Sequence, residues 1–138
     1  MPYATAQDII DRYGEDLLYA IADRDGDQVL DQPAIERALA DAGHEIDAYL
    51  AGRYPLPLVS PPPVLKKVAV DIAVYLLSGD RVTEERRHRY TDAVKLLVRI
   101  GEGKVRLGLP AAEEPASGDQ VLVAAAAPTF TRDALENF

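Results

Sequence analysis

Apolar residues recur at helical spacing through most of the first hundred positions, and this pattern predicts an all-α fold. In the first segment, four apolar side chains are three or four positions apart: Ile10, Tyr13, Leu17 and Ile21. This spacing places side chains on one face of an α-helix. Thr5 is the predicted N-cap. Gly14 interrupts the pattern, so we expect either one kinked helix or two short ones.

A second helical stretch begins at Asp31, which can cap it, and continues to Gly52. Pro33 fits its first turn, where backbone N–H groups have no helical partner. Five prolines then occur within the eleven residues 53–63. Because proline lacks an N–H and blocks the preceding turn, this stretch can be neither a helix nor a central strand. We predict a stiff, extended connector.

The proline-led stretch 61–79 is apolar on nearly every face of the helix that it predicts. Such a helix is either the buried centre of a domain or is covered by neighbouring subunits. A further helix is predicted over residues 83–101, with Thr83 as its N-cap. The chain is therefore expected to form a domain of four to five helices over residues 1–110.

Residues 111–138 are expected to form a linker followed by an extended C-terminal arm. The linker is rich in Pro, Ser, Gly and acidic residues, and the arm carries apolar and aromatic side chains with no evident place in the helical core. Such an arm would dock either on its own domain or on a neighbouring subunit, and we favour the neighbour, because the helices already have their apolar stripes filled. The predicted docking residues are Val121, Leu122, Val123, Phe130, Arg132, Leu135 and Phe138.

Charge is unevenly distributed along this chain of 138 residues with a net charge of −8. Residues 1–50 hold twelve acids and three bases, residues 51–110 hold six acids and eleven bases, and residues 111–138 hold five acids and one base. Oppositely charged regions favour head-to-tail contact between copies or contact with a charged partner. There is no secretory signal pattern, and without cysteine, disulfides and thiolate sites are excluded.

An acidic stretch resembles a calcium-binding loop in its first positions. Its acids occupy positions one, three, five and nine of such a loop: Asp23, Asp25, Asp27 and Asp31. Gln28 stands where the loop needs glycine, and Ala34 replaces the glutamate that completes the oxygen shell. We favour an Asp–Gly turn followed by a helix cap, without metal. A small calcium-binding helical protein with an EF-hand-like loop at 23–34 remains the alternative.

Other chemical signals are weak, and we expect neither an enzyme nor a bound cofactor. His44 and His88 lie on different predicted helices, without the spacing of a metal site. A helical DNA-binding protein is a third hypothesis, because three arginines lie close together: Arg86, Arg87 and Arg89. Glu84 and Glu85 weaken that hypothesis, since they reduce the local attraction for phosphate.

Asp71 is the one carboxylate in the middle of the most apolar predicted helix. A buried carboxylate is costly without a partner, so we expect a structural ion pair. Arg53 on the connector is the first candidate for that pair. Lys67, one turn away, is the second.

Four segments resemble the Mu-like phage neck protein family: "ERALADAGHEIDAYLAGRYPLPL", "PPPVLKKVAVDIAVYLLSG", "ERRHRYTDAVKLLVRIGEGKVRLG" and "FTRDALENF". The family is similar to the head–tail connector, or adaptor, proteins of tailed phages. The resemblance implies a structural virion protein that forms a ring, expected to have twelve subunits, between the portal and the tail. The ring would extend the DNA channel and join head to tail.

The same resemblance implies the chain's partners and its place in the virion. The C-terminal arm would reach the portal protein, and a neck or stopper protein would bind the tail side. Genome DNA would pass through without specific recognition, and no membrane is involved. The expected location is the head–tail junction, with the host cytoplasm as the site of assembly.

Overall fold

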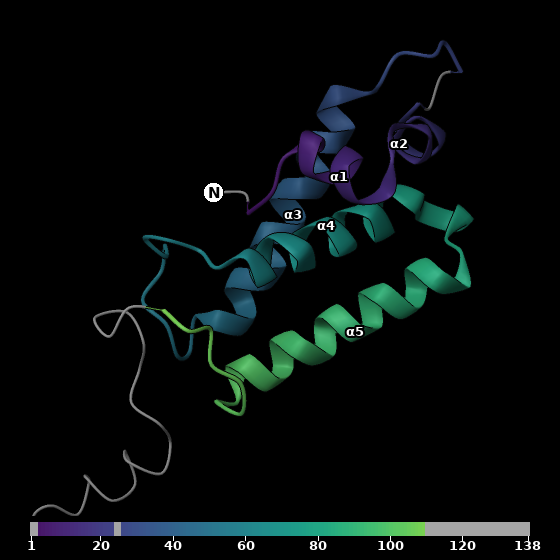
Figure 1. The fold of residues 1–138 in the computed structure, drawn as a ribbon. Coiled ribbons are helices and arrows are strands. Elements are labelled where there is room, and N and C mark those ends of the chain that lie inside the picture. The colour runs from purple at the N-terminus through teal and green to yellow at the C-terminus, as the bar shows by residue number, and fades with distance from the viewer. Residues whose placement is uncertain (1–2, 24–25, 110–138) are drawn as a thin grey trace, which may run out of the picture.

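A computed structural model describes residues 3–23 and 26–109 of the chain. This part contains five α-helices, one short 3₁₀ helix and no β-strand (Figure 1). In chain order these are α1 (Ala6–Tyr13), α2 (Glu15–Ala22), α3 (Gln32–Leu50), α4 (Pro63–Ser78), η1 (Gly79–Arg81) and α5 (Glu84–Gly101). The predicted all-α class is confirmed. The boundary at residue 110 and the arm lie outside the described residues and stay predictions.

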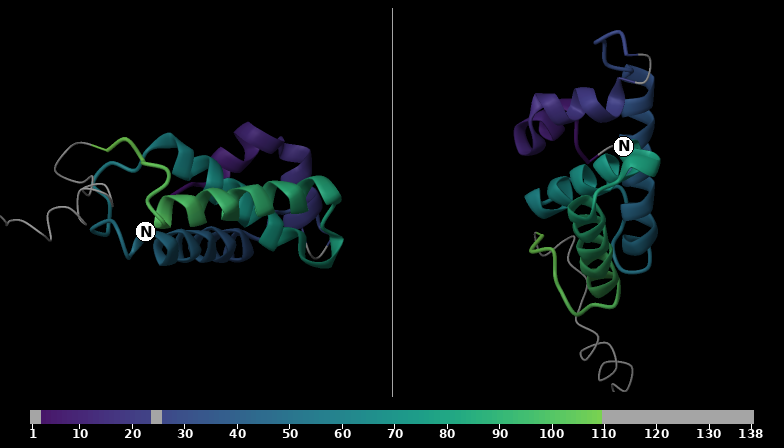
Figure 2. Two further views of the ribbon diagram at one scale, coloured as in Figure 1. Left: turned by 90° about the horizontal axis from the view of Figure 1, so that it is seen from below. Right: turned by 90° about the vertical axis from the view of Figure 1, so that its right-hand side faces the viewer.

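Helix α4 is the centre of the domain, where it packs against each of the other four α-helices. Helices α1 and α2 flank it along one edge, α5 flanks it along the other, and α3 crosses behind it (Figures 1 and 2). Ten of its sixteen residues are buried, which explains its apolar composition. Of the two interpretations of this helix, a buried domain centre is the one that the structure supports. Val64 and Leu76 remain 37% and 38% exposed.

The first helical segment is two short helices that meet at Gly14. This glycine has a φ of +94°, a conformation that side-chain-bearing residues rarely adopt, and it ends α1 and begins α2. Thr5 caps α1 as predicted: its hydroxyl accepts the N–H of Asp8 at 3.3 Å, and its own N–H donates to the Asp8 carboxylate at 2.8 Å. This reciprocal pair satisfies two N–H groups that have no helical partner.

The connector between α3 and α4 contains no helix or strand, in agreement with its prolines. It nevertheless contributes to the core, because Tyr54 and Leu58 are only 4% and 6% exposed. The Tyr54 hydroxyl accepts a hydrogen bond from the N–H of Leu107 at 3.3 Å. That bond joins the connector to the segment that follows α5.

Helix α5 is held against α3 and α4 by both apolar and polar contacts. Its buried side chains are Ala93, Leu97 and Ile100. The Tyr90 ring stacks on Tyr75 of α4 with centroids 4.1 Å apart, and its hydroxyl donates to Glu45 of α3 at 3.1 Å. Near the end of α5, Gly101 lies so close to α3 that a Cβ there would be 2.8 Å from the Tyr49 carbonyl oxygen.

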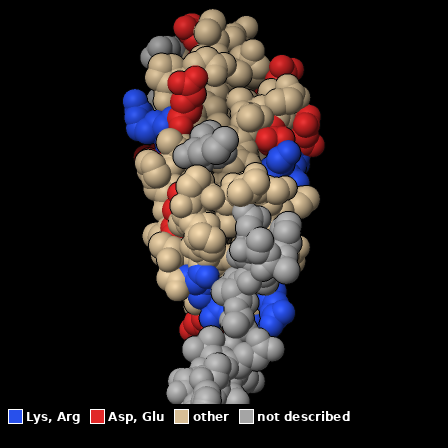
Figure 3. Space-filling model, turned by 90° about the vertical axis from the view of Figure 1, so that its left-hand side faces the viewer, with Lys and Arg blue, Asp and Glu red and all other residues tan. Residues whose placement is uncertain are grey.

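Uncharged residues make up most of what is visible in the upper part of the face in Figure 3, which is the left-hand side of Figure 1, with a few charged side chains among them. The connector and the beginning of α4 lie at this end of the domain (Figure 1). Val59 of the connector is 86% exposed, the largest value among the exposed large apolar residues of the described part. No helix in the described ranges is long and apolar enough to cross a membrane.

Candidate functional site

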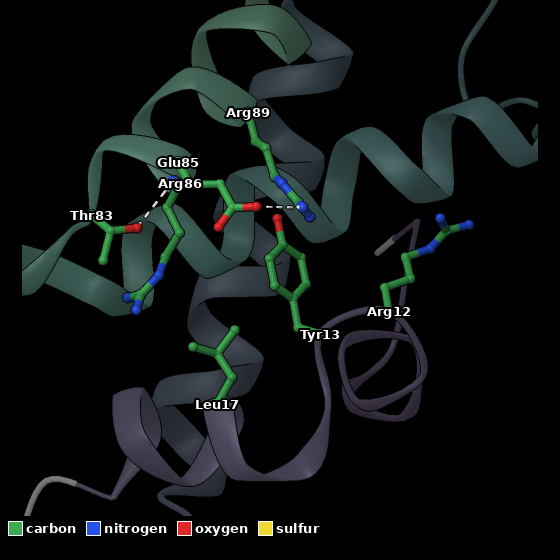
Figure 4. A pocket seen from close by; sticks show the side chains of 7 residues that line it. All are labelled: Arg12, Tyr13, Leu17, Thr83, Glu85, Arg86 and Arg89. Carbon is green, nitrogen blue, oxygen red and sulfur yellow. Dashed lines mark hydrogen bonds and ion pairs between the residues drawn. The ribbon is translucent and has the colours of Figure 1, made fainter.

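A cationic cleft opens between the α1–α2 corner and the beginning of α5, and it encloses ≈ 420 Å³. Three arginines line it: Arg12 from α1, and Arg86 and Arg89 from α5. Figure 4 shows Arg89 reaching toward the ring of Tyr13. The cleft therefore brings together helices that are more than sixty residues apart in sequence.

Local structure at the beginning of α5 fixes two of these arginines. Thr83 caps the helix by accepting the N–H of Arg86 at 3.2 Å. The Arg86 guanidinium donates to the Ser78 hydroxyl at 2.7 Å, and that hydroxyl donates in turn to the Val74 carbonyl of α4 at 2.8 Å. Arg89 pairs with Glu85, one turn earlier, at 2.8 Å. Both guanidinium groups are thus held near the cleft by bonds to α4 or α5.

Tyr13 connects the cleft to the buried centre of the domain. The Arg89 guanidinium lies over its ring, 5.0 Å from the centroid, in cation–π geometry. The Tyr13 hydroxyl donates to Asp71 of α4 at 2.8 Å. Burial, together with this hydrogen bond to a carboxylate, raises the pKa of the Tyr13 hydroxyl to about 12. A neutral, donating tyrosine is therefore maintained at physiological pH.

The cleft carries a surplus of positive charge. Arg12 makes no ion pair with any described residue. Arg86 bonds to a neutral hydroxyl. Glu85 is the one acid that lines the cleft, and it pairs with Arg89. Arg12 and Arg86 thus line the cleft without a carboxylate partner among the described residues, and their guanidinium groups lie on opposite sides of Tyr13 (Figure 4). The whole chain, by contrast, has a net charge of −8.

Asp71 forms its ion pair with the second of the two predicted partners, which corrects our first choice, Arg53. Asp71 is 4% exposed, and its carboxylate is 3.0 Å from the Lys67 ammonium, the second candidate. Arg53 instead places its guanidinium beside Gly103, where a Cβ would be 2.7 Å from Arg53 Cζ. The reason is local: Arg53 comes three residues after the end of α3 and lies beside the end of α5, whereas Lys67 is one turn from Asp71 on the same helix.

The acidic stretch forms the turn and helix cap that we favoured over a calcium loop. The Asp23 carboxylate accepts the N–H groups of Gly26, Asp27 and Gln28 at 2.9, 3.2 and 2.8 Å. Asp31 caps α3 by accepting the N–H of Ala34 at 3.2 Å.

The loop nevertheless has one feature of a calcium loop that the sequence argument did not expect. Gln28 has a positive φ of +63°. Calcium loops adopt a sharp turn at this position and normally have glycine there. Asp25 lies outside the described residues. Among the described residues, no group of three or more acids or histidines is arranged to hold a metal ion.

The three arginines of the DNA-binding hypothesis do not act as one surface. Arg86 and Arg89 line the cleft. Arg87 does not, and its guanidinium is 3.7 Å from Glu84 instead. Sequence reasoning identified Arg86 and Arg89 but missed Arg12 and Tyr13 as cleft residues. A possible signal was a tyrosine within an apolar stripe, since a buried hydroxyl needs a polar partner.

The sequence also matches known phage proteins along most of its length. The model of the family described as Bacteriophage Mu, Gp36 matches residues 3–125. The chain belongs to the phage Mu Gp36 family. It is 39% identical over 107 residues to the Mu-like prophage FluMu protein gp36 of Haemophilus influenzae, which covers 78% of this chain and 76% of that protein. It is 36% identical over 137 residues to gene product J of Escherichia phage Mu, or 96% of each chain.

Membership of the Gp36 family confirms the phage part of the sequence-based resemblance, whereas the connector role stays a prediction. The family match ends at residue 125, and the predicted docking residues Val121 to Phe138 lie outside the described residues.

A smaller groove in the described part of this Gp36-family chain is mainly apolar. It encloses ≈ 270 Å³ between the segment before α1 and the beginning of α3, with Ala4, Ile35 and Leu39 among its lining residues.

Proposed function

We propose that this chain is a structural virion protein, a subunit of a ring that joins the phage head to its tail. Membership of the phage Mu Gp36 family supports a phage role. The domain also has a core of its own, which extends from Ala4 to Leu107. Family membership is the observation on which the proposal chiefly rests.

In the proposed mechanism, the helical domain forms the ring wall and residues 121–138 dock on the portal or on a neighbouring subunit. Twelve copies would match the symmetry expected of the portal, and a neck or stopper protein would bind the tail side. Genome DNA would pass through the ring without specific recognition. The net charge of −8 favours this passage, because acidic walls repel phosphate.

Deletion of residues 111–138, in a phage that encodes this chain, tests the proposal. We expect filled heads and free tails that do not join, seen by electron microscopy of lysates. The full-length chain supplied in trans should restore joined particles. Infectious particles assembled from the truncated chain alone would refute the role of the arm.

A matched pair of substitutions tests the docking contact itself. Phe138→Ala removes an aromatic side chain from the predicted arm, and Asn137→Ala is its polar neighbour and control. Truncating a central aromatic anchor typically costs ~2 kcal/mol or more of binding free energy, about thirtyfold in affinity. Co-sedimentation with purified portal rings would measure the loss. Equal binding by both variants would exclude Phe138 as an anchor.

A further inference from the structure

The cationic cleft can bind an anionic group, because two of its arginines have no acidic partner in the described domain. Among the described residues, Arg12 makes no ion pair and the Arg86 guanidinium bonds to a hydroxyl rather than to an acid, so both retain donor groups for an incoming carboxylate. Arginine presents its donors in a planar fork that matches a carboxylate. Arg89 is already aligned by Glu85 and by the ring of Tyr13 (Figure 4). The side chains are thus partly organised before any ligand binds.

The chain carries acidic residues just beyond the opposite end of the domain. The cleft lies at the beginning of α5, whereas the chain leaves the described domain after the end of that helix (Figures 1 and 2). From Arg89 to Gly101, α5 extends for ~18 Å. Two adjacent acids, Glu113 and Glu114, follow Leu109 by four and five residues. At full extension five residues span at most ~18 Å.

We propose that the cleft of one copy binds the acidic segment 111–119 of a neighbouring copy, with Glu113 and Glu114 contacting Arg12 and Arg86. This inference rests on the proposed ring, since it supplies the contact between adjacent subunits. To reach its own cleft, the segment would have to run straight back along α5 at full length. The cleft of a neighbouring copy does not impose this constraint on the segment.

Two different surfaces at opposite ends of a subunit are what a ring needs. A contact of this kind is heterologous, and repeated copies of it form a closed ring when the rotation between neighbours divides a full turn. The charges are complementary, because the cleft has a surplus of positive charge and residues 111–138 carry five acids and one base. Complementary charges also fix the orientation of partners as they meet.

A peptide carboxylate fits the cleft better than duplex DNA does. DNA binding relies on many phosphate contacts along an extended basic surface. Here the basic groups surround one compact opening, and Glu84 pairs with the nearby Arg87. A segment with one or two carboxylates matches that size and charge.

Cysteine crosslinking in assembled phage particles tests the proposal, because the natural chain has no cysteine. The full-length chain would carry Leu17→Cys, which lines the cleft, and Ala112→Cys, which precedes Glu113. Mild oxidation of purified particles should produce a ladder of linked copies on a denaturing gel. Each single-cysteine chain is the control and should give no ladder longer than a dimer.

Charge substitutions then identify the interaction. Arg12→Glu should reduce the crosslink yield about fivefold, the effect of one or two partly exposed ion pairs, and Glu113→Lys with Glu114→Lys should restore it. Arg37→Glu is the matched control, because Arg37 is an exposed arginine on α3 outside the cleft. Its yield should stay at the level of the parent chain.

If particles contain the chain but show no ladder, the proposal is overturned. A ladder that Arg12→Glu leaves unchanged would also overturn it. Neither result would contradict the proposed ring. A crosslink within a single copy, seen as a faster-moving monomer, would also overturn the proposal. A further result would overturn it as well: the isolated chain binds duplex DNA, Arg12→Glu abolishes this binding, and no ladder forms in the particles. Particles without the chain would instead refute the proposed function.

Discussion

Replacing Asp71 tests whether its buried contacts stabilise the domain. This carboxylate is 4% exposed, accepts the Tyr13 hydroxyl at 2.8 Å and lies 3.0 Å from the Lys67 ammonium. Asp71→Ala removes both interactions and leaves the Tyr13 hydroxyl without its acceptor. We expect a clear loss of stability.

The magnitude follows from the exposure of each partner. A hydrogen bond to a charged acceptor contributes ~1.5–3 kcal/mol to the free energy of unfolding. The Lys67 side chain is 60% exposed, so its ion pair adds ~1 kcal/mol at most. Alanine offsets ~0.5 kcal/mol of this loss through its higher helix propensity. The variant also no longer carries the cost of burying a charge. The net loss should be about 2 kcal/mol, or a Tm lower by ~8–15 °C for a domain of this size.

Thermal melts followed by circular dichroism would measure this difference at neutral pH. Asp92→Ala is the matched control, because Asp92 is an exposed acid on α5 with no ion pair among the described residues. It should change the free energy of unfolding by less than ~0.5 kcal/mol. Tyr13→Phe should cost little more once Asp71 is alanine, since the two share one bond. A melt of Asp71→Ala within the range of the control would refute the reasoning.

Three further outcomes are expected. Gly101→Ala should destabilise the domain by ~1–3 kcal/mol in urea unfolding, because its Cβ would meet the Tyr49 carbonyl, whereas the control Gly52→Ala has open space. The free energy of unfolding should fall as pH rises from 10 to 12, because the pKa of Tyr13 is near 10 in the unfolded chain and about 12 in the folded domain. Tyr13→Phe should flatten that decline. An unchanged slope in this variant would contradict the prediction. Calorimetry with calcium should show no micromolar site, because the N–H groups of the loop already bond to the Asp23 carboxylate. Micromolar calcium binding that Asp23→Ala abolishes would disprove this prediction.

Local signals predicted most of the helical architecture. Thr5, Asp31 and Thr83 each cap the helix that the sequence assigned to them, because capping depends on groups only three residues apart. Gly14 separates two short helices, one of the two outcomes expected from a residue that permits a positive φ. The apolar period of the first segment was less exact. Ile9, Leu18, Ile21 and Ala22 are buried there, whereas Ile10, Tyr13 and Leu17 of the predicted stripe are only half-buried, because Gly14 divides the segment into two helices.

Contacts between distant segments were not predictable in the same way. The Tyr13–Asp71 hydrogen bond joins residues that are 58 positions apart in the sequence. It forms only because α1 packs against α4. The sequence showed that Asp71 needs a partner, but charge alone favoured Arg53 over the nearer Lys67. Arg12 gave no signal, since an isolated arginine on a short helix resembles any solvated residue. The cleft therefore exists only as a product of tertiary packing.

Occupation of the cleft should also affect the stability of the domain. Arg89 lies over the Tyr13 ring, and Tyr13 in turn bonds to Asp71 in the central helix. Helix α1 contributes Arg12 as well as Tyr13 to the cleft, so an acid held by Arg12 and Arg86 would join α1 to α5 directly. A ligand that binds only the folded state stabilises it, and the gain grows with the logarithm of the ligand concentration relative to its Kd. The subunit that receives a neighbour's acidic segment is then expected to become more stable than a free one, which would favour closed rings over open chains.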